Sequence, residues 1–336
     1  MSHEVEVVNG QASMFYVGDK PWHSLGKPVR RGLTTREGII EAGLNWTVSL
    51  KPLFVQPDPD DDAFEQLAWN ATVRDSDKTI LGVVGPTYKP LQNVDAFAFF
   101  DPFVENGMAT LETAGSLKNG KRVWILAKVA LDPIEIVKGD SIERFIVLSN
   151  GHDGTMAIRC GFTPVRVVCA NTLAMAHGDK GSKLLRVRHT DKAKDTLEVI
   201  RDTMNLLNAE FEATAEQFKT LAKHQVNTED LKKYIRMVFK PQVVQVSEEM
   251  GVETENSDGR ADKLLNQILP LFEKGRGNDL PGVAGTLWGA YNAITEFTTW
   301  ERGRNADNRL DSLWFGDSAA VNQRALQLAT KMVAAA

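Results

Sequence analysis

The chain has 336 residues, of which 43% are hydrophobic and 25% are charged, and its net charge is -5. These shares exclude wholesale disorder and a collagen-like chain, and the length predicts one large domain or two moderate ones. No apolar run approaches the ~20 residues of a membrane helix, so no membrane association is expected. Two cysteines cannot form a disulfide framework, and the chain opens without a basic and apolar signal segment, which predicts a cytoplasmic protein.

The charge is spread unevenly along the chain. Residues 111–194 hold 14 basic and 8 acidic side chains, a net charge of +6, whereas residues 1–110 carry -6 and residues 195–336 carry -5. A basic stripe between acidic regions is typical of a protein that grips one polyanion. A solvated charged face beside loops is the alternative that the charges alone leave open.

The first half of the sequence favours short strands with a few helices. An Asn-Gly pair supplies the positive φ angles of a tight turn, so residues 110–117 and 122–130 form the clearest predicted hairpin. The apolar spacing of residues 94–103 is helical, with Asn93 as a natural cap. The other predicted elements are a helix at 34–43, strands at 46–55, 68–74, 79–84, 144–148, 155–159 and 184–188, and a helix at 165–176.

From residue 192 the apolar positions alternate in steps of three and four, which predicts a single helix over about 194–222. Further helices are predicted at 228–239, 261–272, 283–297 and 318–333, with a mobile linker at about 241–260. The predicted fold class is α+β, a mostly antiparallel sheet with a long helix packed on it, followed by a helical C-terminal region. The predicted domains are an α+β core with a basic groove at 1–194 and a helical region at 195–336.

Motifs of catalysis or metal binding are incomplete. Residues 115–121 match the phosphate-loop spacing G-x4-G-K, but Arg122 stands where a hydroxyl would hold magnesium, and a hairpin lacks the helix N-terminus that cradles a phosphate. The acidic run at 58–62 lacks the glycine and the closing glutamate of a calcium loop. The histidines and cysteines within 152–177 lack zinc-site spacing. The sequence therefore predicts no enzyme, no metal and no cofactor.

Basic side chains of the central block are the candidate binding residues. Arg186 and Arg188 alternate on a predicted strand, so they point to one face about 6.6 Å apart, which matches neighbouring phosphates of an extended single strand. Trp124 and Phe162 are candidates for base stacking, with a place in the core as the alternative. The predicted nucleic-acid-binding residues are Lys118, Lys121 and Arg122 at the hairpin tip, Arg159, Arg166, Arg186, Arg188 and His189, and Asn171 on the predicted helix at 165–176.

Several longer runs together carry a family resemblance. They are GSL at 115–117 with Gly120 and VWILA at 123–127, LSNGHDG at 148–154, FTPVRVVCANTL at 162–173, RHT at 188–190, PWHSLG at 21–26, NAITEF at 292–297 and WFG at 314–316. This combination resembles the phage/plasmid-like protein family, whose members occur in bacteriophages, prophages and conjugative plasmids. The likeness spans nearly the whole chain.

The order of elements in that family is similar to the Rad-fifty-two type of single-strand annealing protein, which forms rings that hold single-stranded DNA in a basic groove. The resemblance implies a single-stranded DNA binding and strand-annealing protein of a phage or mobile element, acting in recombination in the cytoplasm of a bacterial host. It also implies a homo-oligomeric ring or filament, with host or phage recombination proteins as possible partners.

Two other functions are left open by the sequence. The first is a phage or plasmid accessory protein that binds a host protein through its helical second half, as an anti-defence or regulatory component without nucleic-acid binding. The second is an enzyme acting on nucleic acid, with a site assembled from scattered Asp, Glu and His residues. Affinity for oligonucleotides at low salt and metal-dependent strand cleavage discriminate among the three.

Overall fold

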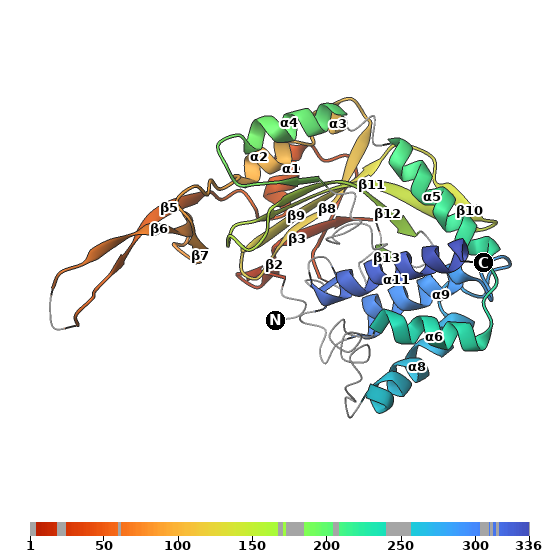
Figure 1. The fold of residues 1–336 in the computed structure, drawn as a ribbon. Coiled ribbons are helices and arrows are strands. Elements are labelled where there is room, and N and C mark those ends of the chain that lie inside the picture. The colour runs from red at the N-terminus through yellow and green to blue at the C-terminus, as the bar shows by residue number, and fades with distance from the viewer. Residues whose placement is uncertain are drawn as a thin grey trace.

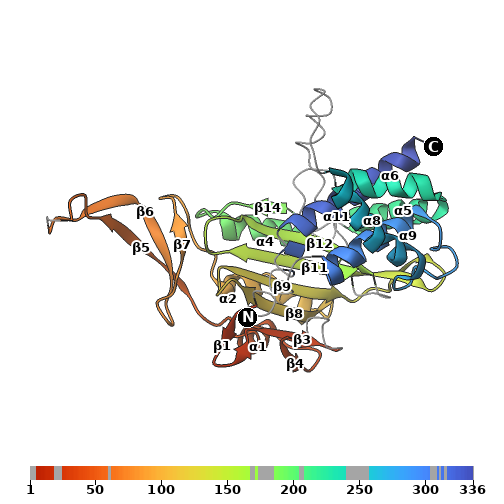
Figure 2. The same ribbon diagram turned by 90° about the horizontal axis from the view of Figure 1, so that it is seen from below.

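The computed structural model describes residues 5–18, 25–59, 62–166, 171–172, 185–203, 208–239, 257–302, 309, 312–313 and 316–335. Its fold is of the predicted α+β class, with a mostly antiparallel sheet in the first half and helices in the second (Figure 1). A long hairpin leaves one end of this main sheet, and the C-terminal helices pack at the other end (Figure 2).

The main sheet has nine described strands in the order β13-β12-β11-β9-β8-β3-β4, with β10 also paired to β11 and β14 to β12. Its strand pairs are antiparallel except for the parallel pair β3–β4. The strands are β3 (Met14–Val17), β4 (Lys27–Val29), β8 (Ala109–Leu117), β9 (Arg122–Val129), β10 (Ile134–Val137), β11 (Asp140–Gly151), β12 (Ile158–Arg166), β13 (Asn171–Thr172) and β14 (Leu185–Val187). A separate small pair joins β1 (Val7–Val8) to β2 (Gln11–Ala12).

The hairpin predicted from the Asn-Gly pair is confirmed. Leu117 at the end of β8 pairs with Arg122 at the start of β9. Lys118 and Asn119 have φ angles of 55° and 56°, and Gly120 has 87°. The left-handed backbone at these positions closes the turn and sets the register of β8 against β9.

The two faces of the main sheet pack differently. Four helices cover one face (Figure 1), namely α1 (Thr35–Glu41), α2 (Asn93–Ala98), α3 (Asp101–Glu105) and α4 (Ala193–Thr203). Because side chains alternate along a strand, Val123 and Ile125 of β9 join the cluster under these helices, whereas Trp124 and Leu126 join a smaller cluster on the opposite face. The predicted helix at 94–103 is split between α2 and α3.

A second sheet of three antiparallel strands projects from the molecule, and we call its residues 48–84 the arm. Its strands are β5 (Val48–Val55), β6 (Glu65–Arg74) and β7 (Ile80–Val84), in the order β5-β6-β7. Figures 1 and 2 both show β5 and β6 extending well beyond the main sheet.

The second half of the chain forms its own helical core. Its elements are α5 (Asn208–Lys223), α6 (Thr228–Phe239), α8 (Ser257–Lys274), α9 (Leu287–Glu296), a π-helix (Phe297–Glu301) and α11 (Asp317–Ala334). Trp288 and Tyr291 of α9 are fully buried in this core and pack on Phe218 of α5. The indole Nε1 of Trp288 donates a hydrogen bond of 2.8 Å to the carboxylate of Asp140, which joins the core to β11.

The single helix predicted over 194–222 is wrong, because the chain forms α4 and α5 instead, and residues 204–207 lie outside the described residues. Leu197 and Ile200 of α4 pack under the main sheet, whereas Phe211 and Phe218 of α5 pack in the helical core. The apolar residues of both segments are buried as predicted, but those of α4 and those of α5 pack in different hydrophobic cores.

The predicted helix at 165–176 is also wrong where the structure describes it. Residues 165–166 end β12, and Asn171–Thr172 form β13. Residues 257–260 of the predicted linker belong to α8, and the rest of 241–260 lies outside the described residues.

Candidate nucleic-acid interface

Three arginines from three strands gather at the end of the main sheet beside the root of the arm. Arg159 of β12 pairs directly with Arg186 of β14 and with Ser149 of β11. Arg122 opens β9 and pairs with Gly151, two residues further along β11. With strands ~4.8 Å apart and ~3.3 Å per residue, the three Cα atoms fall within about 16 Å. We call Arg122, Arg159 and Arg186 the arginine cluster.

The three side chains share one face of the sheet. Residues that pair directly across antiparallel strands project to the same side, and Arg122 lies two residues before Trp124, whose ring belongs to the cluster opposite helices α1–α4. Register thus carries the three arginines to the face that those helices leave uncovered. Arg186 is exposed, and Arg122 and Arg159 are half-buried.

The pKa of Arg159 reflects both its burial and the charges of the other two arginines. Burial lowers the pKa of the Arg159 guanidinium, and the positive charges of Arg186 and Arg122 lower it further. An arginine remains charged even so. Three cations held together on one surface raise the positive potential there, which favours an anion.

A buried hydroxyl lies in the same row of the sheet. Ser149 is fully buried, pairs with Arg159 on one side and with Trp124 on the other, and its hydroxyl has no hydrogen-bond partner among the described residues. Trp124 is 2% exposed and packs in the core, so it offers no stacking surface. Phe162 also packs inward, against two of the apolar clusters.

The hairpin tip beside the arginine cluster is held against the arm. A Cβ atom added to Gly120 would lie 3.0 Å from Nη1 of Arg74 and 3.4 Å from the ring of Trp46. The carbonyl of Lys121 accepts a 2.8 Å hydrogen bond from the backbone of His152. Lys118 and Lys121 are therefore half-buried residues of an anchored turn at the edge of the cluster.

His189 and Arg188 follow β14 but differ in placement. Arg188 is exposed next to Arg186. His189 is 8% exposed, its ring stacks on Tyr88 with centroids 4.6 Å apart, and its Nε2 lies 3.2 Å from the carbonyl oxygen of Met156. Burial lowers the pKa of His189. Its ring secures the chain after β14 and is turned into the protein.

Two further predicted residues lie away from the cluster. Arg166 pairs with Asn171 at the opposite end of β12, seven residues or about 23 Å from Arg159. Asn171 is in strand β13 rather than on a helix. The structure thus brings together Lys118, Lys121, Arg122, Arg159, Arg186 and Arg188, and does not bring Arg166 and Asn171 to them.

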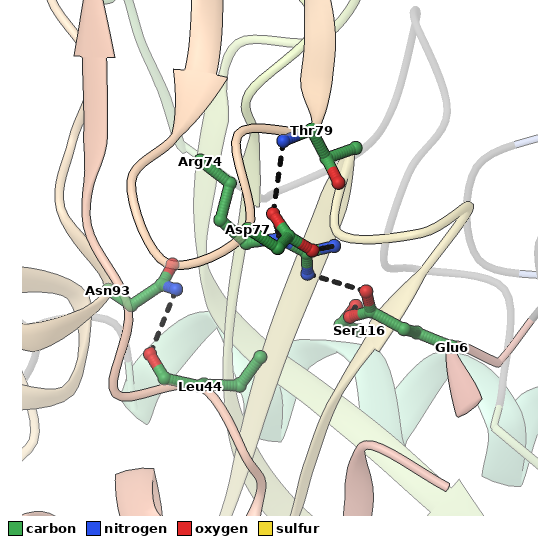
Figure 3. Close-up of polar contacts among 7 residues, drawn as sticks. All are labelled: Glu6, Leu44, Arg74, Asp77, Thr79, Asn93 and Ser116. Atoms are coloured by element: carbon green, nitrogen blue, oxygen red, sulfur yellow. Dashed lines mark hydrogen bonds and ion pairs between the residues drawn. The ribbon is translucent and has the colours of Figure 1, made fainter. Parts of the chain in front are cut away.

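A buried ion-pair network joins the arm to the main sheet next to this site (Figure 3). Arg74 of β6 reaches the carboxylate of Glu6, whose other oxygen accepts a 2.7 Å hydrogen bond from Ser116 of β8. The side chains of Arg74 and Glu6 are 6% and 4% exposed. Arg74 also pairs with Asp77 at 2.9 Å, and its guanidinium lies 5.1 Å from the Trp46 ring centroid.

Hydrogen bonds set the protonation of this network. Burial alone lowers the pKa of Arg74, but its hydrogen bonds to Glu6 and Asp77 raise the pKa above the ordinary arginine value. Burial alone raises the pKa of Asp77, but the backbone amide of Thr79 and the Arg74 side chain lower it below the ordinary value. Arg74 and Asp77 therefore both stay charged at neutral pH. No sequence motif points to Glu6 and Arg74, which are 68 residues apart.

A neutral histidine is buried behind the turn after β11. His152 is fully buried, and its Nε2 lies 3.0 Å from Oδ1 of Asn93, whose amide nitrogen donates to the Leu44 carbonyl at 3.0 Å (Figure 3 shows the second bond). Burial lowers the pKa of His152 to about 3, with smaller contributions from His189 and Arg74. His152 therefore packs the core and does not titrate near neutral pH.

Metal-ligand clusters and membrane-spanning helices are not found among the described residues. In the part of the chain that the structure describes, no three His, Cys, Asp or Glu side chains lie together as metal ligands. None of the described helices combines the length and the hydropathy of a membrane span.

The fold and the site define an α+β protein with a basic surface at one end of an antiparallel sheet. Residues 80–314 match the family described as Domain of unknown function (DUF932). This match covers more than half of the chain, so the protein belongs to the DUF932 family. It includes the whole arginine cluster, while β5 and β6 precede it. No curated protein and no solved structure matches the chain.

Proposed function

We propose that this protein binds single-stranded DNA through the arginine cluster and promotes annealing of complementary strands. The observation that supports the proposal is the register of β9, β11, β12 and β14, which carries Arg122, Arg159 and Arg186 to one face and one end of the sheet. The effect of Arg122 and Arg186 on the pKa of Arg159 is a second sign that their charges are concentrated there.

The dimensions suit an extended strand rather than a single small anion. A cluster about 16 Å across spans two to three phosphates at the ~6.6 Å spacing of a stretched backbone. The half-buried Arg122 and Arg159 contribute donors that packing holds in place, and the exposed Arg186 and Arg188 extend the row. Annealing needs no cofactor, because aligning extended strands with exposed bases lowers the entropic barrier to pairing.

The family resemblance supplies the biological setting of the proposal. The motifs shared with the phage/plasmid-like family, and the likeness in element order to the Rad-fifty-two type, support a role in recombination of a phage or mobile element. We place the protein in the cytoplasm of a bacterial host, as a homo-oligomeric ring or filament, with recombination proteins as possible partners.

The test measures binding to a labelled oligothymidine by fluorescence anisotropy at several salt concentrations, with duplex DNA beside it. The variant is Arg186→Ala with Arg188→Ala. The matched control is Lys223→Ala with Lys233→Ala, which removes two exposed charges from α5 and α6. Losing two phosphate contacts lowers the slope of log K against log salt by about 1.4 and weakens binding roughly 25-fold at 0.1 M salt.

Annealing of complementary oligonucleotides is followed in the same samples. We expect the arginine variant to lose both binding and annealing, and the lysine control to keep both. Wild-type affinity in the arginine variant contradicts the proposed interface. No binding by the wild type at low salt contradicts the function itself and leaves the host-protein partner as the explanation to pursue.

A further inference from the structure

The part of the arm farthest from the main sheet exposes aromatic side chains, and we call its residues 52–69 the outer arm. Phe54 is 55% exposed, Phe64 65% and Trp69 53%, and no other phenylalanine or tryptophan among the described residues is exposed. Figures 1 and 2 show this part of β5 and β6 extending away from the main sheet and from the helices. Aromatic surface that no core of the protein covers marks an interaction site.

Two of these rings are neighbours on one face of the hairpin. Phe54 of β5 pairs with Gln66 of β6, and Phe64 directly precedes β6, two residues before Gln66. Because side chains alternate along a strand, Phe64 projects to the same face as Phe54. Diagonal neighbours of this kind have Cα atoms about 7–8 Å apart, which is within reach of aromatic side chains. The outer arm therefore presents two largely exposed rings next to each other.

Carboxylates accompany the two rings. Residues 52–69 carry five acidic side chains and no basic one, so the outer arm has a charge of -5, which equals the net charge of the whole chain. Asp58, Asp62 and Glu65 are exposed. Glu65 pairs with Val55, the residue that follows Phe54. The surface is thus aromatic and negatively charged at the same place.

Exposed rings beside carboxylates suit the chemistry of arginine. A guanidinium group stacks on an aromatic face and also donates paired hydrogen bonds to a carboxylate, whereas a lysine ammonium acts as a compact point charge. The root of the arm contains a buried example of this arrangement. There the Arg74 guanidinium lies 5.1 Å from the Trp46 ring centroid and forms an ion pair with Glu6. The outer arm offers rings and carboxylates but contributes no arginine of its own.

We propose that the outer arm binds an arginine-rich segment of a partner protein. Guanidinium groups of that segment stack on Phe54 and Phe64 and pair with the carboxylates of Asp62 and Glu65. The aliphatic stems of the same arginines cover ring surface that is now exposed to water. The charge of the segment is complementary to that of the outer arm, which speeds the encounter and selects against acidic partners.

Charge also distinguishes this partner from two other occupants. A nucleic acid would bring its negatively charged phosphates to a surface of five carboxylates. The outer arm of a second copy carries the same five carboxylates, so pairing two outer arms sets like charges against each other. A basic segment is favoured by the same carboxylates that repel both of these.

This contact is independent of DNA binding, since the arginine cluster lies at the root of the arm rather than on the outer arm. Binding of the segment is measured without DNA, so failure of the proposed function leaves this inference standing, and the reverse holds as well.

The first test selects peptides from a random dodecapeptide library displayed on phage, with the whole wild-type chain immobilised. Phage that bind the variant Phe54→Ser with Phe64→Ser are removed beforehand, which discards peptides that bind elsewhere on the protein. We expect the enriched peptides to have a net positive charge and to contain arginine more often than lysine. Enrichment of neutral or acidic peptides, or no enrichment over the starting library, overturns the proposal.

The second test measures the affinity of the most enriched peptide by fluorescence anisotropy. The variant Phe54→Ser with Phe64→Ser should raise the dissociation constant about 10-fold, because both stacking surfaces are lost. The variant Asp62→Asn with Glu65→Gln should raise it about 5-fold, because two carboxylates are lost. Replacing each arginine of the peptide by lysine should also raise it about 5-fold, because lysine does not provide the planar fork of donors.

Two control variants match these changes on other surfaces. Ile40→Ser with Val94→Ser alters two side chains on α1 and α2 that are each 59% exposed. Glu105→Gln with Glu198→Gln removes two exposed carboxylates from α3 and α4. Both controls should leave the dissociation constant unchanged, and circular dichroism confirms that each variant is folded. An affinity that the outer-arm variants leave unchanged, or that is equal for the arginine and lysine peptides, overturns the proposal.

Sedimentation equilibrium of the protein alone tests a second copy as the occupant. We expect the wild type and the variant Phe54→Ser with Phe64→Ser to have the same mass, as a single chain of 37.1 kDa or a multiple of it. An oligomer that the serine substitutions dissociate would assign the outer arm to self-association and overturn the proposal.

Discussion

Removing the guanidinium of Arg74 is expected to be the most damaging single change near the candidate site. The Arg74→Met variant leaves the carboxylate of Glu6, 4% exposed, without its cation. Breaking one side of a buried ion pair costs about 3–5 kcal/mol, because the remaining charge is neither solvated nor neutralised. The Ser116 hydroxyl still donates to Glu6 but cannot offset that loss. We expect the free energy of unfolding to fall by about this amount.

The assay is urea unfolding at pH 7, followed by tryptophan fluorescence. The double variant Glu6→Gln with Arg74→Met removes the orphaned charge, so it should recover part of the loss. The control Lys27→Met breaks an exposed pair with Glu41, whose side chains are 57% and 29% exposed, and should change stability by less than about 1 kcal/mol. If Arg74→Met falls within that same margin, the network does not hold the arm as described.

Three other changes test the packing around the site. His152 stays neutral in the folded protein because its pKa is lowered to about 3, whereas in the unfolded chain it binds a proton as the pH falls below about 6.5. The free energy of unfolding should therefore drop by up to ~1.4 kcal/mol for each pH unit below that value. The urea midpoint of the His152→Gln variant should no longer fall with pH in this way. Gly82→Ala places a Cβ 2.6 Å from the Cα of Asp153 and should cost about 2 kcal/mol or more by thermal unfolding, whereas Gly85→Ala meets nothing within 4 Å and should be nearly neutral. Tyr234→Phe removes a buried 2.9 Å hydrogen bond to a carbonyl of α11 and should lower the free energy of unfolding by about 1 kcal/mol in the same assay. An unchanged stability would indicate that α6 and α11 are held together by packing alone.

Local chemistry made part of the fold predictable. The Asn-Gly turn carries its own backbone preference, so the β8–β9 hairpin follows from two residues and an alternating flank. The helices α6 and α11 were expected within a residue of their ends, because their apolar spacing is continuous. The helix over 194–222 failed for the complementary reason. The spacing of apolar residues does not predict which hydrophobic core they join. Leu197 packs in the core under helices α1–α4, whereas Phe218 packs in the helical core.

The candidate site shows the same division. The sequence identified a basic central block, but the pairing of Arg159 with Arg186 depends on strand register between segments far apart in the chain. Arg166 belongs to the same strand as Arg159, but it lies seven residues further along β12, away from the cluster. His189 looked equivalent to its arginine neighbours, and its burial against Tyr88 could not be read from its position.

The arm was expected as strands but not as an exposed element. Residues 68–74 and 79–84 alternate as a hairpin should, and the structure confirms a pair there. Alternation predicts that one face is covered, yet β6 reaches beyond β7 and leaves its first residues exposed. What covers that face is decided by tertiary or quaternary contacts, which periodicity does not encode.

Phe162 on β12 packs against both the cluster under helices α1–α4 and the helical core. Unfolding of either core would remove part of the packing around the other, because both contact Phe162. Heat should therefore unfold the described halves in one calorimetric transition rather than two. A fragment cut near residue 194 would also lose Leu197 and Ile200 from the first cluster. Each separated half would expose hydrophobic surface that is buried in the intact protein, and proteases and chaperones would act on it more readily.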